Sequence, residues 1–170
     1  LGDVYKRQIY KGLKPVYWCP NDETALAEAE IEYQDDPCTT VYVKFQMKDD
    51  QGKLAAYDHS KLYFVIWTTT IWTLPGNLAI ALHPDESYAL VKAPNGETYI
   101  MAEALVEKVM KVGGFESWEI AETHPGSFFE NMLAQHPFLD KTSRLLLADY
   151  VTMDSGTGCV HTAPGFGADD

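Results

Sequence analysis

Residues 62–77 read Leu-Tyr-Phe-Val-Ile-Trp-Thr-Thr-Thr-Ile-Trp-Thr-Leu-Pro-Gly-Asn, an apolar run that passes directly into a threonine-rich loop. The first five residues are typical of a buried β-strand. Three consecutive hydroxyls follow at Thr68, Thr69 and Thr70, and such groups are costly to bury without hydrogen-bond partners. Because a Pro-Gly-Asn turn comes next, we expect them where a strand opens into a loop, a common place for binding residues. A purely structural, threonine-rich strand end is the alternative.

The rest of the sequence predicts a mainly β domain with peripheral helices. Extended segments are predicted at residues 14–18, 39–47, 78–82, 88–92, 97–101, 118–121, 128–134 and 143–150. Residues 103–112 carry apolar side chains at helical spacing and end at a Gly-Gly pair, which predicts a helix. Residues 23–33 fit a helix by composition and an exposed strand by alternation. Many short strands with tight turns favour a closed or partly closed barrel.

Composition and charge narrow the function classes. The 170 residues have 46% hydrophobic content, which is enough for one globular domain with a real core. A net charge of −12, with only two arginines, argues against a self-sufficient DNA or RNA binder, because phosphate neutralisation supplies most of such affinity. If a nucleic acid contacts this chain, we expect groups outside the chain to supply most of the binding affinity.

The cysteines and the hydropathy pattern predict a cytoplasmic location. Cys19, Cys38 and Cys159 form no Cys-x-x-Cys pair and are odd in number, which is typical of reduced thiols. No apolar run approaches the length that crosses a bilayer, so we expect no membrane partner.

A second site-like segment closes the chain. Residues 156–170 read Gly-Thr-Gly-Cys-Val-His-Thr-Ala-Pro-Gly-Phe-Gly-Ala-Asp-Asp. If residues 157–161 form a strand, Thr157, Cys159 and His161 share one face. A histidine and a carboxylate brought together by the Pro-Gly turn can orient a ligand amine, position a water or transfer a proton. A structural histidine is the alternative for His161.

Sharper catalytic motifs find little support. Cys159 and His161 are close enough in sequence to be a thiol nucleophile and its base, but nothing marks the thiol as activated. A zinc site from Cys19, Cys38 and a histidine has no metal-ligand spacing. The glycines at 156 and 158 lack the third glycine of a dinucleotide loop, and no Walker loop is present.

Four ordered segments resemble the editing domain (CP1) inserted in class I aminoacyl-tRNA synthetases of the isoleucine, valine and leucine group. They are Lys-Pro-Val-Tyr-Trp-Cys-Pro at 14–20, Thr-Ala-Leu-Ala-Glu-Ala-Glu-Ile-Glu-Tyr at 24–33, the loop at 67–77, and 156–170. The Ala-Leu-Ala-Glu stretch at 25–28 is most similar to the isoleucyl branch. The resemblance covers residues 9–170, with an N-terminal segment at 9–47 and a barrel at 48–170. Residues 1–8 are interpreted as a separate tail, and we expect the domain to be truncated at its C-terminal end.

This resemblance implies an aminoacyl-tRNA deacylase, which would hydrolyse the ester of mischarged Val-tRNA(Ile), with valyl-adenylate as a second candidate substrate, while excluding isoleucine by size. Thr68, Thr69 and Thr70 would hydrogen-bond the terminal ribose and the attacking water. Asp170 would hold the α-ammonium group by a charge-assisted hydrogen bond. No residue is an obvious strong base, so a positioned water aided by a ribose hydroxyl is favoured over covalent catalysis.

The resemblance also implies a substrate-binding set. Trp72 and Thr73 would help line the pocket, and Asn77 would end the loop and support it. His161 would contact the amino-acid side chain, where its bulk would exclude isoleucine.

The implied partner is the 3′ end of aminoacylated tRNA(Ile), held mainly by other domains of a parent enzyme, with no DNA involved. Editing would need no cofactor. ATP and magnesium belong to the synthetic domain, whose His-x-Gly-His and Lys-Met-Ser-Lys-Ser motifs are absent from this sequence. Two alternatives stay open. One is a non-catalytic module that binds the tRNA end, and the other is the editing domain of a valyl- or leucyl-tRNA synthetase.

Overall fold

The computed structural model describes residues 12–13, 15–35, 37–167 and 170. The chain divides into two compact units, Leu1–Pro37 and Cys38–Asp170. The predicted tail at residues 1–8 and the predicted domain start at Ile9 lie outside the described residues. The division comes earlier than the predicted boundary at residue 47, because the strand that contains residue 47 is paired into the sheet of the second unit.

The Leu1–Pro37 unit contains a small hairpin and a short 3₁₀ turn. β1 (Trp18–Cys19) pairs antiparallel with β2 (Thr24–Ala25). η1 (Glu28–Glu30) follows, and Glu30 Oε2 accepts a hydrogen bond from the backbone N–H of Ala27 at 2.7 Å. Residues 23–33, for which helix and strand were both open, therefore form neither one continuous helix nor one continuous strand.

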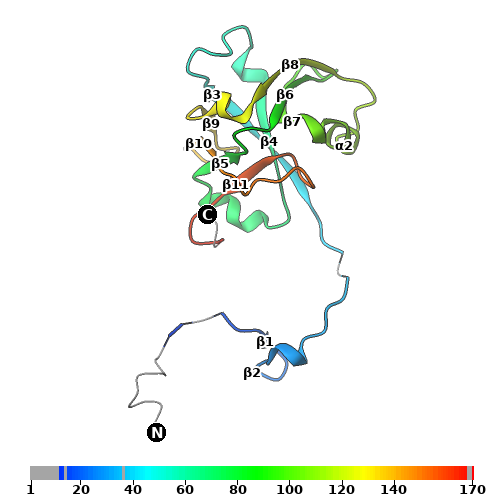
Figure 1. Ribbon diagram of the computed structural model, residues 1–170, viewed down its shortest axis with the longest axis vertical. Coiled ribbons are helices and arrows are strands. Elements are labelled where there is room, and N and C mark those ends of the chain that lie inside the picture. The colour runs from blue at the N-terminus through cyan, green and yellow to red at the C-terminus, as the bar shows by residue number, and fades with distance from the viewer. Residues whose placement is uncertain (1–11, 14, 36, 168–169) are drawn as a thin grey trace. The chain divides into compact units, whose positions relative to one another are not determined.

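In the described residues of the Cys38–Asp170 unit, nine strands form one mixed sheet in the order β11-β5-β10-β9-β3-β4-β7-β6-β8 (Figure 1). The strands are β3 (Val41–Asp49), β4 (Leu62–Thr68), β5 (Ala79–Leu82), β6 (Ser87–Lys92), β7 (Thr98–Ala102), β8 (Glu119–Pro125), β9 (Leu133–Gln135), β10 (Thr142–Leu147) and β11 (Cys159–Thr162). The connections contain η2 (His59–Lys61), η3 (Ile71–Gly76), η4 (Glu103–Leu105), α2 (Val106–Val112) and η5 (Gly126–Phe129). The prediction of a mainly β fold with a few peripheral helices is confirmed.

Burial explains why the central strands form. Phe45 and Met47 of β3 are buried at alternate positions, as the period of two predicts. β3 pairs antiparallel with β4, whose Phe64 and Ile66 are fully buried in the same core. The turn between the two strands begins at Asp50, whose carboxylate accepts backbone hydrogen bonds from Gly52 and Leu54 at 2.8 and 2.6 Å. The strand that precedes the threonine loop is therefore anchored in the centre of the core.

One predicted strand is partly wrong. Residues 128–134 do not form a single extended segment, because the 3₁₀ turn η5 runs into them and β9 begins only at Leu133. Phe129 is fully buried and packs edge-on against Phe64, with ring centroids 5.7 Å apart. Aromatic packing thus decides the local backbone in place of strand propensity. The helix predicted at residues 103–112 is confirmed as η4 followed by α2.

The sheet curls, but within the described residues no strand pairing joins its two end strands, β11 and β8. The backbone N–H of Ala102, at the end of β7, donates to the carbonyl of Thr157 at 2.8 Å, so the segment before β11 approaches β7. Barrel closure therefore remains a prediction. No helix in the described part of the chain has the length and apolarity that crossing a bilayer requires.

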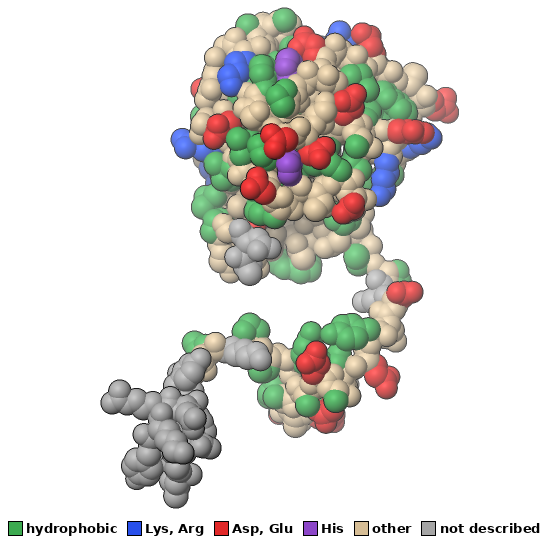
Figure 2. Space-filling model, viewed as in Figure 1, with side chains coloured by type: hydrophobic (Ala, Val, Ile, Leu, Met, Phe, Trp, Pro, Cys, Tyr) green, Lys and Arg blue, Asp and Glu red, His purple; other side chains and the backbone are tan. Residues whose placement is uncertain are grey.

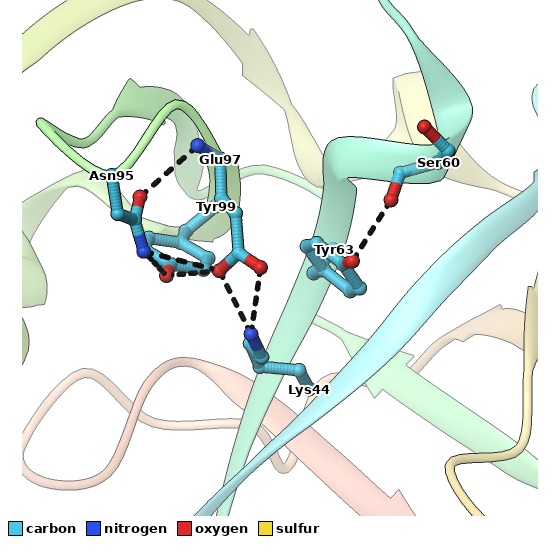
Figure 3. Close-up of polar contacts among 6 residues, drawn as sticks. All are labelled: Lys44, Ser60, Tyr63, Asn95, Glu97 and Tyr99. Carbon is cyan, nitrogen blue, oxygen red and sulfur yellow. Dashed lines mark hydrogen bonds and ion pairs between the residues drawn. The ribbon is translucent and has the colours of Figure 1, made fainter.

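A polar cluster ties β3 to the turn between β6 and β7 (Figure 3). Lys44 Nζ donates to both carboxylate oxygens of Glu97, at 2.9 and 2.8 Å, and lies 4.7 Å from the ring centroid of Tyr63. Burial, together with a hydrogen bond to Glu97, raises the pKa of Tyr99 to about 12. The Lys44 side chain is 46% exposed, so this ion pair is expected to contribute at most about 1 kcal/mol.

Candidate functional site

The three consecutive threonines stand at the end of β4 and turn there into η3. Thr68 is 8% exposed, and its Oγ1 accepts a hydrogen bond from the backbone N–H of Thr70 at 3.1 Å. The Oγ1 atoms of Thr68 and Thr70 lie 3.3 Å apart. Thr69 and Thr70 are exposed. The predicted position of these hydroxyls, where a buried strand opens into a loop, is confirmed.

The 3₁₀ geometry of η3 decides which of its side chains reach the site. Side chains three residues apart eclipse in such a helix, so Thr70 and Thr73 share a face, and Thr73 Oγ1 donates to the carbonyl of Thr70 at 2.8 Å. Trp72 falls between them and is 69% exposed. It does not contribute to the lining of the cavity described below, in contrast to the prediction for this residue.

The opposite wall comes from the segment around β11, which lies at the same end of the unit as η3 (Figure 1). Two glycines allow its close approach. Gly158 has φ +71°, and a Cβ built on it would lie 2.4 Å from the Cβ of Ala102. Gly156 has φ +73° and packs against the side chain of Trp67. Residues with a Cβ rarely adopt this backbone conformation, so both positions favour glycine.

Two hydrogen bonds connect the walls through the ring of His161. His161 Nε2 lies 3.0 Å from Thr73 Oγ1, and Nδ1 lies 2.7 Å from Asn77 Nδ2. Asn77 is fully buried, and its Nδ2 also donates to the carbonyl of Ala79 at 2.8 Å, which fixes the orientation of the amide. An amide nitrogen can only donate, so Nδ1 of His161 is an acceptor and its proton resides on Nε2.

The environment keeps His161 neutral. Burial lowers the pKa of His161, and Asp170 opposes that effect with a smaller charge interaction. In the neutral form, Nε2–H donates to Thr73 Oγ1, whose own hydrogen points to Thr70. Neither ring nitrogen therefore offers an unengaged lone pair, and His161 is placed as a rigid wall and hydrogen-bond donor rather than as a general base.

Asp170 supplies a carboxylate to the same space. Its Oδ2 accepts a hydrogen bond from the backbone N–H of Ala163 at 3.1 Å, which orients the carboxyl group. The residue is exposed and lines the cavity beside Gly167. Its charge and position suit it to hold a cationic group of a ligand.

Between the walls lies a cavity of about 390 Å³. Its lining comprises Trp67, Thr68, Thr69, Thr70, Thr73, Tyr150, Thr152, Ser155, Gly156, Thr157, Gly158, Cys159, Val160, His161, Phe166, Gly167 and Asp170. Six of the eight predicted site residues are brought together here: the four threonines at 68, 69, 70 and 73, His161 and Asp170. Asn77 does not contribute to the lining and acts from behind His161.

Four polar or aromatic lining residues were not predicted from the sequence. Tyr150, Thr152 and Ser155 lie between β10 and β11, and no periodicity singles them out. The position of Phe166 between two glycines of the closing segment is the sequence feature that could have indicated it. A Cβ built on Gly76 would lie 2.7 Å from its ring, so Phe166 joins the closing segment to the end of η3.

The thiol alternative is not supported by the geometry of Cys159. Cys159 is 3% exposed, its Sγ faces the carbonyl of Ile100 at 3.9 Å, and burial raises its pKa. A thiol that is buried and protonated is a poor nucleophile. Among the residues that the structure describes, no cluster of three metal-ligating side chains is present.

The family model for class I tRNA synthetases (I, L, M and V) matches residues 3–143. The chain belongs to this family. The match begins at residue 3 and therefore includes part of the predicted tail at residues 1–8.

Curated relatives within this family of synthetases include two bacterial isoleucine–tRNA ligases. That of Caldanaerobacter subterraneus subsp. tengcongensis is 54% identical over 172 residues, which cover 99% of this chain and 18% of the relative. That of Caldicellulosiruptor saccharolyticus is 55% identical over 172 residues, which cover 99% of this chain and 19% of the relative. The chain thus corresponds to a fragment of isoleucine–tRNA ligase and spans about a fifth of the length of these relatives.

Solved structures that resemble this member of the class I synthetases share its fold. The cytosolic leucyl-tRNA synthetase editing domain of P. knowlesi has a TM-score of 0.60 and 12% identity, with 77% of this chain and 60% of that chain covered. GlLeuRS-CP1 also has a TM-score of 0.60, with 17% identity over 74% of this chain and 55% of that chain. The editing-domain fold expected from the sequence is therefore supported by structure as well.

Proposed function

We propose that this chain is the editing module of an isoleucine–tRNA ligase and hydrolyses the ester bond of Val-tRNA(Ile). The observation that carries the proposal is the cavity in which the threonine wall, His161 and Asp170 meet. A synthetic site shaped for isoleucine gains only about 1–3 kcal/mol against valine from one methylene, a general figure for which isoleucyl-tRNA synthetase is itself the standard example. A second, hydrolytic site that excludes the larger side chain overcomes this limit.

The groups present favour attack by a positioned water. His161 is neutral with both ring nitrogens engaged, and Cys159 is buried, so neither supplies a strong base or nucleophile. The hydroxyls of Thr69 and Thr70 are exposed at the cavity and can hold a water and the terminal ribose. A vicinal ribose hydroxyl can then assist proton transfer from that water, while Asp170 holds the α-ammonium group.

The proposed exclusion of isoleucine by size depends on a rigid cavity wall at His161. A side chain can reject one additional methylene only if it does not move aside, and His161 is held by hydrogen bonds at both ring nitrogens. The same ring presents no charge, so it does not compete with the α-ammonium group for Asp170. A rigid and neutral ring suits a histidine that excludes aliphatic side chains above a certain size.

The negative charge of the chain supports the proposal that another part of the enzyme delivers the tRNA end. Asp and Glu side chains are spread over the face of the Cys38–Asp170 unit shown in Figure 2, and the net charge of the chain is −12. Such a surface repels a phosphate backbone. Only the short, aminoacylated 3′ end is expected to enter the cavity.

The decisive assay measures deacylation of Val-tRNA(Ile) and Ile-tRNA(Ile) by the chain. We expect hydrolysis of the valyl ester with the isoleucyl ester spared. Thr69→Val removes a cavity hydroxyl with little change in shape and should slow the reaction, while Thr142→Val, at an exposed position of β10, should not. Equal survival of both esters, with tRNA binding retained, would instead indicate a non-catalytic module.

A further inference from the structure

His136 is a buried histidine outside the cavity lining that holds the loop from behind. It follows β9 and is 2% exposed. Its Nδ1 accepts hydrogen bonds from the backbone N–H groups of Leu139 at 3.1 Å and Phe138 at 3.4 Å. The remaining nitrogen, Nε2, lies 2.8 Å from the carbonyl of Leu74. Because Nδ1 is an acceptor, Nε2 carries the proton and donates to that carbonyl.

The carbonyl of Leu74 connects this histidine to the candidate site. It also accepts the backbone N–H of Asn77 at 3.0 Å. The side chain of Asn77 in turn donates to Nδ1 of His161. One continuous series of hydrogen bonds therefore runs from His136, through Leu74 and Asn77, to His161.

The surroundings of His136 make it a rigid anchor. Its ring meets those of Phe45 and Phe138 edge-on, with centroids 5.7 and 4.6 Å away. Its backbone N–H donates to the carbonyl of Lys141 at 2.9 Å, which closes the connection from β9 to β10. Lys141 Nζ donates to the carbonyl of Pro75 at 2.5 Å, so the same connection contacts η3 at two successive carbonyls.

We propose that His136 is a positioning residue for the hydrolytic site: its hydrogen bond to the Leu74 carbonyl holds Asn77 where it fixes the tautomer and orientation of His161. The effect on hydrolysis rests on the proposed function, whereas the effect on His161 does not. His136 does not contribute to the cavity lining, so it acts on rate and selectivity without touching the substrate.

The test uses two-bond ¹H–¹⁵N spectra of the histidine rings in the chain. In the wild type, His136 and His161 should both be neutral with the proton on Nε2. His136→Phe keeps apolar packing but loses the donor, so His161 should change to a mixture of tautomers. His136→Gln places an amide N–H near the original Nε2 position and should restore the single tautomer, and His124→Phe, on β8, should leave it unchanged.

Kinetics supply a second measurement. For His136→Phe we expect about a tenfold loss of kcat on Val-tRNA(Ile), with KM unchanged and a smaller ratio of valyl to isoleucyl hydrolysis. His136→Gln should recover most of the rate and the ratio. An unchanged His161 spectrum in His136→Phe would overturn the proposal, and so would failure of His136→Gln to restore it. A wild type with the proton on Nδ1 of His136 overturns it even if the Phe variant does not fold.

The two proposals fail separately. If the wild-type chain hydrolyses neither ester, the proposed function is lost, while the ring spectra still decide whether His136 controls His161. If the esters are hydrolysed selectively but the spectra do not respond to His136→Phe, only the positioning role is lost.

Discussion

Asn77→Asp changes a single donor group into an acceptor and should reverse the electrostatics of His161. The amide nitrogen of Asn77 lies 2.7 Å from Nδ1 of His161 and can only favour the neutral ring. A carboxylate at the same distance favours a protonated ring and is expected to raise the pKa of His161 above that of the wild type. The other titratable groups whose charge acts on His161, namely Asp170, His136 and Lys141, are the same in both proteins.

The pH dependence of stability should change sign with this substitution. Burial lowers the pKa of His161 in the folded wild type below the value of about 6.5 expected when unfolded, so the His161 contribution to stability is lost as the pH falls below about 6.5. When the pKa in the variant exceeds about 6.5, the new ion pair stabilises the fold below that pH, and its contribution is lost as the pH rises through the raised pKa. At pH 8, a carboxylate that faces the carbonyl of Ala79 should cost about 1–3 kcal/mol.

Two measurements check this reasoning. NMR titration of the His161 ring gives the pKa directly, and thermal unfolding at pH 5.5 and pH 8 gives the sign of the stability change. Asn131→Asp adds the same charge at a position with φ +64° that aspartate tolerates, and it should leave the His161 pKa unchanged. An equal pKa for His161 in the wild type and Asn77→Asp would refute the assignment of Asn77 as the group that keeps the ring neutral.

Three other substitutions probe the cavity walls. His161→Ala should admit isoleucine, so that Ile-tRNA(Ile) is cleaved in a deacylation assay. An unchanged ratio of valyl to isoleucyl hydrolysis would show that His161 does not exclude isoleucine. Asp170→Asn should reduce hydrolysis of Val-tRNA(Ile) by about tenfold or more, because a charge-assisted hydrogen bond to the α-ammonium group is lost. The Tm should not fall. Normal turnover with a large loss of stability would indicate that the Asp170 carboxylate is structural. Gly158→Ala should cost about 2–5 kcal/mol in chemical denaturation, from a strained φ and the contact with Ala102. Gly96→Ala, with φ +82° and open space, should cost only about 1–2 kcal/mol, and equal losses would contradict the contact argument.

Local sequence patterns were sufficient for the core strands, whereas most of the site residues were predicted only through the family resemblance. Alternation in β3 and the apolar run of β4 predicted both strands, because their side chains meet the core with a simple period. Hydroxyls at the end of a buried strand marked the threonine segment as unusual, but the roles of the threonines, His161 and Asp170 came from the resemblance. Trp72 was placed wrongly because the sequence did not reveal a 3₁₀ turn, which directs it away from Thr70 and Thr73. The proposed role of His136 could not be predicted from the sequence, since it depends on a hydrogen bond to the Leu74 carbonyl, 62 residues away along the chain.

The contact between the two walls is decided by strand pairing, which no local pattern encodes. β11 pairs antiparallel with β5, and His161 stands opposite Ile80. Just before β5, the backbone N–H of Leu78 donates to the carbonyl of Thr162 at 3.0 Å, which brings Asn77 beside the His161 ring. A shift of one residue in this pairing would turn His161 to the other face of the sheet and separate it from Asn77. The threonine hydroxyls therefore face His161 only because η3 leads directly into β5, the strand that fixes the register of β11.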